Sequence, residues 1–531
     1  MAFSRRDFLL RVGQAGGYSA AFLTMQHLGL MPMPEVGAAP LALANGSGKG
    51  TKVVILGGGI AGLVAAYEMG KAGYSCTVLE ARPRPGGRNW TVRNGTKIDF
   101  NDGTTQTASW EDSSYFNAGP ARLPSIHKTM LGYCKELGVP LEVEVNSSRS
   151  SLLQNDSVFE GKAIEQRQAV NDTRGHVSEL LAKCIRQNAL DAELTKDDRE
   201  RMLEFLRTYG DLKPDYSYQG SERSGAVKMP GAGPDAETLR PPLAMHALLD
   251  ANFWTGMLYE EMLDMQATMF QPVGGMDRIP YAFAKKLGDV VQYGSQVKEI
   301  RKTEDGVRIS YAKSGAVRVL EADYCICALP LTILKSIPND FSPRIQRAIN
   351  EVGYDSAYKV AWESRRFWEQ DYNLYGGLSF VTKGPVELMW YPSWKLFSEK
   401  GVIVAGYGIE NKSDFGKLPN LAAKLDASRA AVEKLHPGHG KELMNPMYVN
   451  WGEIPFNLGS WVGHTRDRVT GRPAEYYEGA YKEFIQPDDR IYFSGDHCSH
   501  IIGWQEGAAL ASHRAVSLIA ERVQAAKTHE A

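Results

Sequence analysis

The 531-residue sequence lacks several features that would assign it to a specialised class of protein. It has no apolar run of about 20 residues, which a membrane-spanning helix requires. It also has no long basic run and no RNA-binding signature, and its 60 basic and 62 acidic residues leave a formal net charge of -2. Such a balance gives no electrostatic reason to bind nucleic acid. We therefore expect neither stable membrane insertion nor a nucleic-acid partner.

Cysteine is scarce, and its spacing does not suggest a metal site. The six cysteines form no C-x-x-C pair, and no cluster of cysteine and histidine has the spacing of a zinc site. Cys325 and Cys327 alternate within the apolar run YCICAL, which predicts a buried strand. We therefore expect no bound metal and thiols that act as small buried hydrophobic groups.

The remaining composition is that of a soluble globular protein, with 43% hydrophobic and 23% charged residues. At roughly 150 residues per domain, a chain of this length is expected to form about three domains.

The N-terminus has the pattern of an export signal. Arg5 and Arg6 stand before an apolar, small-residue stretch, as in a twin-arginine signal. The sequence A-L-A at 42–44 resembles a signal-peptidase site. We therefore predict that residues 1–44 are a signal peptide removed after Ala44, and that the mature protein is periplasmic or extracellular. A disordered basic leader and an uncleaved anchor are the alternatives.

The segment that follows has the pattern of a dinucleotide-binding unit. TKVVILGGGIAGLVAAYEMGKAGYSCTVLEAR indicates a strand, a glycine turn, a helix and a second strand. Gly57 permits the tight turn, Gly59 lets a pyrophosphate approach the backbone, and Gly62 lets the helix pack closely on the strand. Glu80 ends the second strand at about the ~20-residue spacing of a ribose-binding acid.

From Glu80 onwards the sequence EARPRPGGR resembles the flavin-containing amine oxidase family, whose members carry E-A-x-x-R-x-G-G-R behind the same fingerprint. The resemblance implies FAD as the cofactor, with Glu80 on the adenosine ribose and Arg88 at the pyrophosphate. Val297 would clamp the adenine through its backbone. IYFSGDHCSH resembles the closing flavin motif, in which Asp496 stands where most members have glutamate. No cysteine matches the position of covalent attachment, so FAD binding is expected to be non-covalent.

The cofactor-binding residues implied by this resemblance come from several separated segments. The full set is Gly57, Gly59, Ile60, Ala61, Gly62, Glu80, Ala81, Arg82, Gly87, Arg88, Gly119, Pro120, Ala121, Arg122, Val297, Trp451, Gly495, Asp496, Gly503 and Trp504.

The segment FNAGPARLPSIH is similar to the G-P-x-R-[LF]-P segment of L-amino acid oxidases, in which the arginine binds the substrate carboxylate. A guanidinium group pairs with a carboxylate in a planar, bidentate arrangement that fixes the neighbouring α-carbon. We therefore expect Arg122 to bind a substrate carboxylate. The alternative is a salt bridge to an aspartate, or a phosphate contact.

Further residues of the implied substrate site lie near the middle and the end of the chain. Tyr407 resembles a tyrosine whose hydroxyl also reaches the carboxylate. Gly503 and Trp504 match a glycine carbonyl that accepts the substrate amine and an aromatic wall beside it, and Trp461 is a candidate for the side-chain pocket. Lys359 matches the family lysine that holds a water against flavin N5, and a buried lysine is expected to be partly neutral. The expected catalytic residues are Lys359, Arg122, Tyr407 and Trp504.

The implied fold is α/β. It contains a Rossmann-like FAD-binding domain of the two-dinucleotide-binding-domain type, a mixed-sheet substrate domain and a helical insertion. The expected segments are 50–125, 269–338 and 471–525 for the FAD-binding domain, 126–268 for the helical domain and 339–470 for the substrate domain. The Pro/Gly-rich stretch 211–242 is too long for a plain connector. It is either a loop over the substrate funnel or a surface insertion.

These features predict an FAD-dependent L-amino acid oxidase, which converts a free L-amino acid, water and molecular oxygen into a 2-oxo acid, ammonia and hydrogen peroxide. An L-amino-acid 2-monooxygenase on the same scaffold is the nearest alternative. A monoamine or polyamine oxidase would leave Arg122 without a role. A non-enzymatic FAD-binding protein is the alternative from a different class. Trp461 and Trp504 favour large apolar side chains, and a homodimer is the default expectation for a soluble enzyme.

Overall fold

The computed structural model describes residues 41, 43–111, 113–463 and 475–530. Leu43–Ala531 forms one compact unit, distinct from Met1–Ala42. Almost all of the predicted signal peptide, including both of its arginines, therefore lies outside the described residues. In the part of the chain that is described, no helix is long and apolar enough to span a bilayer.

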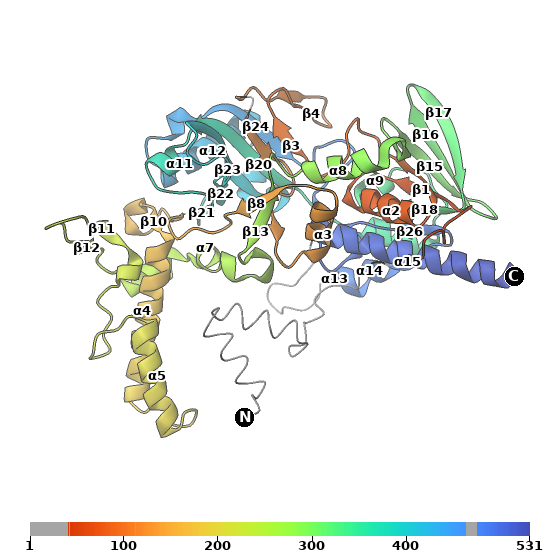
Figure 1. Cartoon of the computed structure of the whole chain (residues 1–531). Coiled ribbons are helices and arrows are strands. Elements are labelled where there is room, and N and C mark those ends of the chain that lie inside the picture. The colour runs from red at the N-terminus through yellow and green to blue at the C-terminus, as the bar shows by residue number, and fades with distance from the viewer. Residues whose placement is uncertain (1–40, 42, 112, 464–474, 531) are drawn as a thin grey trace, which may run out of the picture. The chain divides into compact units, whose positions relative to one another are not determined.

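A parallel five-stranded sheet forms the centre of the dinucleotide-binding region, with the strand order β14-β2-β1-β18-β26 (Figure 1). Its strands lie in the three segments that the sequence assigned to this domain. Both faces of the sheet are covered, which explains the continuous apolar runs of β1 and β18. The strands are β1 (Lys52–Leu56), β2 (Ser75–Leu79), β14 (Val291–Gln292), β18 (Tyr324–Cys327) and β26 (Ile491–Phe493).

Helices and a small sheet cover the two faces of this parallel sheet. The long C-terminal helix α15 packs against α2, and the antiparallel sheet β15-β16-β17 shares a hydrophobic core with β1 and β18. Cys325 and Cys327 are fully buried in β18, as their alternation predicts. The elements are α2 (Ile60–Lys71), α15 (Gln505–Glu530), β15 (Gln296–Lys302), β16 (Val307–Lys313) and β17 (Ala316–Ala322).

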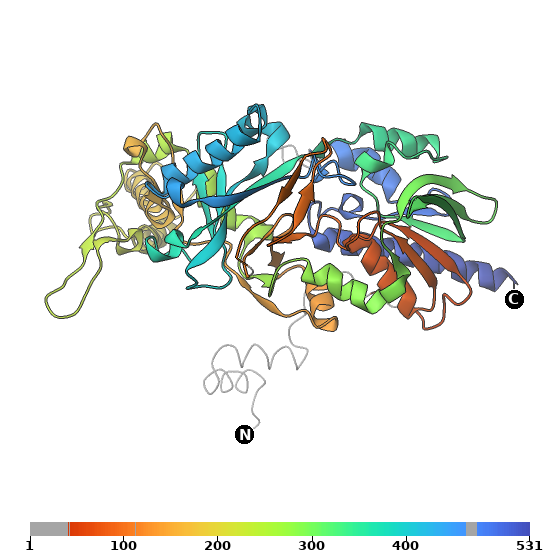
Figure 2. The ribbon, with the colours of Figure 1, turned by 90° about the horizontal axis from the view of Figure 1, so that it is seen from above.

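A mixed seven-stranded sheet forms the second large layer, beside the first (Figure 2). Its order is β10-β9-β21-β22-β23-β20-β24, with β9 parallel to β21 and the other neighbours antiparallel. The strands are β9 (Leu152–Gln154), β10 (Ile164–Glu165), β20 (Ala357–Arg365), β21 (Leu378–Val381), β22 (Leu388–Trp390), β23 (Lys400–Ile409) and β24 (Met444–Asn450).

The segment 126–268 differs from the expectation of a wholly helical insertion. It contributes β9 and β10 to the seven-stranded sheet, and β8 (Leu141–Glu144) to a three-stranded sheet with β7 (Leu123–Pro124) and β13 (Met269–Pro272). These strands are short and pair with partners far away in the sequence, so local periodicity does not reveal them. The helices of this segment are α3 (Lys128–Glu136), α4 (Gln166–Arg186), α5 (Lys196–Tyr209), α6 (Met245–Ala251) and α7 (Trp254–Met257).

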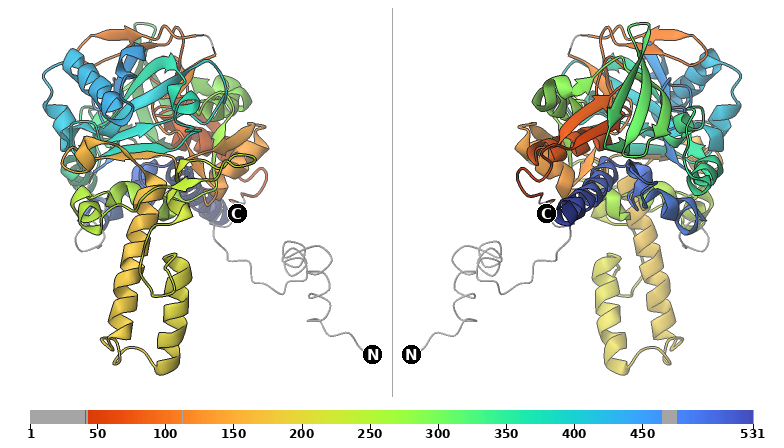
Figure 3. Two further views of the ribbon diagram at one scale, coloured as in Figure 1. Left: turned by 90° about the vertical axis from the view of Figure 1, so that its left-hand side faces the viewer. Right: turned by 90° about the vertical axis from the view of Figure 1, so that its right-hand side faces the viewer.

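Helices α4 and α5 lie side by side and extend away from the sheets (Figure 3). They share a small core of their own. The Pro/Gly-rich stretch 211–242 follows α5 and contains the hairpin of β11 (Ala226–Lys228) and β12 (Thr238–Leu239), most of it exposed.

The other strands and α-helices of the described chain lie around these layers. The strands are β3 (Thr91–Arg93), β4 (Lys97–Asp99), β5 (Thr105–Thr107), β6 (Tyr115–Asn117), β19 (Tyr354–Asp355) and β25 (Trp461–Val462). The helices are α8 (Arg278–Leu287), α9 (Leu331–Leu334), α10 (Pro343–Glu351), α11 (Phe367–Gln370), α12 (Leu421–Leu435), α13 (Glu475–Glu478) and α14 (Ala480–Phe484).

Candidate active site

A cavity of about 580 Å³ is lined by residues of the seven-stranded sheet and by residues of the connections that follow strands of the five-stranded sheet. Every residue that the sequence assigned to cofactor, substrate or catalysis lines this cavity, with the exception of Gly62. No cysteine is among the lining residues in the described part of the chain. The residues predicted from separate motifs thus line a common cavity.

The glycine turn between β1 and α2 forms one end of the cavity. Gly57 has a φ of +101°, a conformation that favours glycine, and a Cβ added at Gly62 would clash with the carbonyl oxygen of Gly57. Gly62 therefore acts through packing and does not reach the cavity. A Cβ added at Gly59 would meet no atom within 4 Å. Gly59 caps α2 without a side-chain hydrogen bond, so the first-turn N–H groups of the helix can bind phosphate.

Glu80 is held at the end of β2 by two backbone donors. Its carboxylate accepts hydrogen bonds from the N–H of Gly58 at 2.7 Å and the N–H of Arg82 at 2.8 Å. The Arg82 guanidinium donates to the side-chain oxygen of Asn457 at 2.6 Å. Val297 lines the cavity next to an irregularity in the pairing of β15 with β16. These positions suit an adenosine with its ribose on Glu80.

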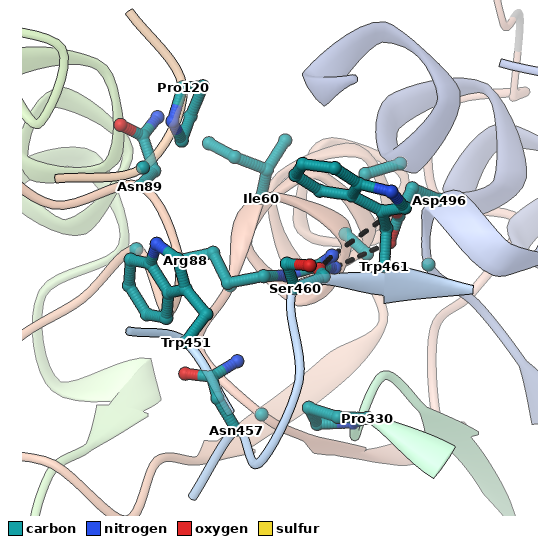
Figure 4. Close-up of a pocket in the computed structure, with 18 of the residues that line it drawn as sticks. Ile60, Arg88, Asn89, Pro120, Pro330, Trp451, Asn457, Ser460, Trp461 and Asp496 are labelled. Carbon is teal, nitrogen blue, oxygen red and sulfur yellow. Dashed lines mark hydrogen bonds and ion pairs between the residues drawn. The ribbon is translucent and has the colours of Figure 1, made fainter. Parts of the chain in front are cut away.

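Arg88 and Asp496 form an ion pair that joins the N-terminal and C-terminal parts of the site (Figure 4). Arg88 also donates to the carbonyl oxygen of Ser460, and Asp496 accepts the N–H of Gly503 at 2.9 Å. Burial would raise the pKa of Asp496, but the charge and hydrogen bonds of Arg88 hold it below the usual value. The motifs of the sequence assign each of the two residues separately to the cofactor, whereas in the fold they also pair with each other.

The residues around this end of the cavity fit FAD. His497 Nε2, Asn89 Oδ1 and Gln505 Nε2 are buried and line the cavity, and among the described residues none of these atoms has a hydrogen-bond partner. Buried polar atoms of this kind are costly unless a ligand or water satisfies them. Together with the N-terminus of α2, they supply the polar groups that a phosphate- and amide-rich cofactor needs.

Arg122 lies at the other end of the cavity, just before β7. Its side chain is buried, and it donates to the side-chain oxygen of Asn146 and to the hydroxyl of Tyr259 at 3.3 Å. Its guanidinium carbon lies 4.1 Å from the centre of the Trp390 ring. Within the described ranges it makes no ion pair with an aspartate or glutamate. A salt bridge to an aspartate, the alternative role considered for Arg122, is therefore not formed.

Lys359 and Tyr407 are directly opposite each other in the pairing of β20 with β23, and both face the cavity. The Lys359 ammonium nitrogen donates to the carbonyl oxygens of Asn117 at 2.7 Å and Gly119 at 2.6 Å. Burial, and secondly the charge of Arg122, lower the pKa of Lys359 to about 7. Near neutral pH this amine is therefore partly uncharged, as expected for a buried lysine.

Aromatic side chains form the remaining wall. Trp504 packs edge-on against the buried ring of His127, with the ring centres 4.9 Å apart, and a Cβ added at Gly503 would lie 3.6 Å from Trp461. Trp451 donates its indole N–H to the carbonyl oxygen of Ala118 at 3.0 Å. These contacts fix the indole rings along the cavity between the two predicted binding regions.

Three residues that surround Arg122 were not predicted from the sequence. Trp390 comes from the three-residue strand β22, Tyr259 from a single helical turn, and Asn146 from the chain after β8. None of these segments is long enough to show a periodic pattern. No signal in the sequence distinguishes these residues from ordinary core and surface positions.

The stretch 211–242 contributes no residue to the cavity lining. Met265, which follows α7 and is part of a short helical turn at Leu263–Met265, does line it. Most of the stretch 211–242 is exposed, including its hairpin of β11 and β12.

Comparisons with known proteins agree with this arrangement. A family model described as flavin containing amine oxidoreductase matches residues 60–520. The chain is 26% identical to the L-amino-acid oxidase of Siganus canaliculatus over 494 residues, 88% of this chain and 85% of that protein. It is 27% identical to the flavin-dependent L-tryptophan oxidase RebO of Lentzea aerocolonigenes over 502 residues, 88% and 98% of the two chains. Its fold is similar to that of cyclohexylamine oxidase from Brevibacterium oxydans IH-35A, with a TM-score of 0.58 and 16% identity over 89% of this chain and 99% of that one.

Proposed function

Because the chain belongs to the flavin-containing amine oxidoreductase family, we propose that it catalyses the oxidative deamination of free L-amino acids. The reaction converts the amino acid, water and molecular oxygen into a 2-oxo acid, ammonia and hydrogen peroxide. FAD is the cofactor, and when bound it supplies the group that accepts a hydride from the substrate α-carbon. The protein supplies binding, orientation and electrostatics.

The observation that carries this proposal is the buried, cavity-facing guanidinium of Arg122, which makes no ion pair within the described residues. A buried charge without a counter-ion is costly, and a bound carboxylate would remove that cost. A simple amine has no carboxylate to offer, whereas a free amino acid does. The L-amino-acid oxidases among the relatives are consistent with this substrate class.

The remaining side chains orient the substrate around this anchor. Tyr407 lines the cavity near Arg122, whose charge acts on the Tyr407 hydroxyl, so the two can share the carboxylate. The carbonyl of Gly503 can accept a hydrogen bond from the substrate amine. Trp504 limits the position of the amine, and the apolar walls exclude water from the α-carbon. Lys359 has a pKa of about 7 and keeps a proton-accepting amine near neutral pH, held in place by two carbonyl groups.

The preferred side chain is proposed to be large and apolar. Trp390 and Met265 line the cavity near Arg122, and Trp461 lines it beside Gly503. Among the described lining residues the carboxylates are Glu80 and Asp496, and both are engaged elsewhere. A cationic side chain would thus find no counter-ion there, while an aromatic ring would find aromatic partners. The L-tryptophan oxidase among the relatives supports the same preference.

The test is an anaerobic titration of the FAD-loaded protein with L-amino acids, D-amino acids and amines, followed by product analysis in air. The proposal expects bleaching of the flavin absorbance by large apolar L-amino acids, and a 2-oxo acid with ammonia and peroxide as products. An amide and carbon dioxide would indicate an amino-acid 2-monooxygenase instead. Bleaching by amines alone, or by nothing, would refute the proposal.

We also propose that the protein is exported by the twin-arginine route to the periplasm or beyond. The support is the Arg5-Arg6 pair and the A-L-A sequence at 42–44, which precedes the proposed cleavage after Ala44. The twin-arginine pathway carries folded proteins, which suits an enzyme that acquires its cofactor before export.

A homodimer is a further proposal. Its support is the frequency of two-fold dimers among soluble enzymes and the exposed apolar side chains on α4 and α5, among them Leu180 and Phe205. Light scattering on the purified protein would give the oligomeric state directly.

A further inference from the structure

Glu144 is a buried carboxylic acid that stands directly behind the substrate end of the cavity. It is the last residue of β8, pairs with Met269 in β13, and is only 4% exposed. One carboxyl oxygen accepts the indole N–H of Trp390 at 3.2 Å. The other is buried and has no hydrogen-bond partner within the described residues. A buried carboxyl oxygen without a hydrogen bond carries a desolvation penalty that lowers the stability of the fold.

Trp390 lies between Glu144 and Arg122 and contacts both. Its N–H is bound by Glu144, and one face of its ring lies against the Arg122 guanidinium, 4.1 Å from ring centre to guanidinium carbon. Arg122 has five N–H donors, and two of its hydrogen bonds go to Asn146 and Tyr259. The orientation of the remaining donors therefore depends on the indole that Glu144 holds.

Glu144 and Arg122 also interact through their charges. Burial raises the pKa of Glu144 to about 7, and this value already includes the opposing effects of Arg122 and of the Trp390 hydrogen bond. The other titratable groups around Arg122 are Lys359 on β20, Tyr407 on β23 and Tyr259 after α7. On β8 itself, Glu142 lies on the same face two residues earlier.

We propose that Glu144 is a positioning residue that sets the affinity of Arg122 for the substrate carboxylate. Its carboxyl group holds the Trp390 indole against the guanidinium, and its negative charge competes with the incoming carboxylate for Arg122. This inference rests on the proposed function, because it takes a substrate carboxylate as the ligand of Arg122.

The two parts of this role have different consequences for binding. When a second carboxylate arrives, like-charge repulsion favours the protonated form of Glu144, so binding draws a proton onto it. Above the pKa of Glu144, affinity for a carboxylate ligand therefore falls with rising pH, by up to about tenfold per unit. Loss of the indole anchor should instead weaken binding at every pH.

The experiment uses the FAD-loaded protein and benzoate, a carboxylate that cannot be oxidised. Affinity is measured from pH 6 to pH 9 by the change in the flavin spectrum, and proton uptake by calorimetry in two buffers of different ionisation enthalpy. For the unmodified protein we expect affinity to fall across this range, with net proton uptake on binding near pH 7.

Two variants separate the charge from the hydrogen bond. Glu144→Gln keeps an acceptor for the Trp390 N–H and removes the charge, so it should flatten the pH dependence and reduce proton uptake. At one pH unit above the pKa of Glu144, this variant should bind benzoate about tenfold more tightly than the unmodified protein. Trp390→Phe keeps the carboxyl group and removes the anchor, so it should weaken binding throughout. It should keep a pH dependence that begins at higher pH, because the lost hydrogen bond had lowered the pKa of Glu144. Lys359 also titrates in this range, but it is present in all of these proteins, so the difference between them reports Glu144.

Glu142→Gln is the matched control. Glu142 lies on the same strand and face but interacts with Gln271 at 3.2 Å instead of Trp390. It should bind benzoate like the unmodified protein. A Glu144→Gln protein with an unchanged pH profile and unchanged proton uptake would overturn the inference while leaving the proposed function intact. If benzoate and L-amino acids fail to bind even the unmodified protein, the proposed function itself fails. If Glu144→Gln does not fold, absence of proton uptake by the unmodified protein still refutes the competition of charges.

Discussion

Replacing Arg122 with methionine should separate the contribution of this residue to activity from its contribution to stability. Methionine keeps much of the side-chain length and apolar contact with Trp390 but removes the charge and every N–H donor. Each hydrogen bond to a charged group contributes about 1.5–3 kcal/mol. Loss of a bidentate pair therefore costs about 3–6 kcal/mol, or roughly a 10²- to 10⁴-fold decrease in kcat/KM for L-amino acids.

The same substitution should not destabilise the fold. Arg122 makes no ion pair in the described chain, so removing it eliminates a desolvated charge without breaking a salt bridge. Glu144, whose charge also acts on Arg122, has a pKa that burial raises to about 7, so it can take up a proton when Arg122 is removed. Arg366 is the matched control, because it is also fully buried but pairs with the carboxylate of Glu369. Arg366→Met leaves Glu369 unpaired and should lower the free energy of unfolding by about 3–5 kcal/mol.

The assays are steady-state peroxide production with L-amino acids, bound flavin from the visible spectrum, and thermal unfolding of both variants. We expect Arg122→Met to retain FAD and its melting temperature, and to lose its preference for an amino acid over the amine that lacks the carboxylate. The reasoning is refuted if kcat/KM of this variant stays within tenfold of the original. It is also refuted if Arg122→Met destabilises the protein as much as Arg366→Met does.

Three further predictions concern the lysine, the cofactor and the leader. The pKa of Lys359 falls from its ordinary value of 10.5 to about 7 on folding, so between these pH values the unfolded chain binds one more proton than the folded protein. The free energy of unfolding should therefore rise with pH across that window. Urea unfolding of Lys359→Met should lack this rise, and an equal rise in both proteins would contradict the assignment. Glu80→Ala should weaken FAD binding at least about tenfold through the lost ribose hydrogen bonds, measured by the fluorescence of released flavin. Acid precipitation of the original protein should release all of its flavin. Flavin that stays with the precipitate would show covalent attachment. Lysine in place of both Arg5 and Arg6 should retain the precursor in the cytoplasm, whereas the exported original should begin directly after Ala44 by N-terminal sequencing; export of the double variant would argue against the twin-arginine route.

Local sequence determined the dinucleotide-binding unit. The alternation of strand, glycine turn, helix and strand between Lys52 and Glu80 depends on residues close together in the chain, so periodicity and glycine spacing were enough to predict it. The parallel strands and the open backbone at Gly59 confirm that part of the fold. The resemblance to a flavin-containing family also predicted Arg122, Lys359 and Tyr407 as site residues, and all three line the same cavity.

Tertiary structure decided which side chains surround these residues. The ion pair of Arg88 with Asp496 joins positions 408 residues apart, and only the pairing of sheet strands brings them together. Trp390 faces Arg122 because of the register of the short strand β22 against β23. Such a register is fixed by distant partners and not by a pattern within three residues, since shifting a strand by one residue turns its side chains to the opposite face.

Glu144 illustrates the same distinction. Its place in the run LEVEV is compatible with an exposed strand, and only the packing of β8 against β13 and Trp390 buries it. Burial, in turn, raises the pKa of Glu144 to about 7, and the charge of Arg122 opposes this shift. The sequence by itself therefore determined the dinucleotide-binding unit, because that unit depends on a local motif, and the resemblance of a short segment to a known family predicted Arg122 as the anchor for a substrate carboxylate. The electrostatic surroundings of that anchor depend on contacts between distant strands, which only the folded chain provides.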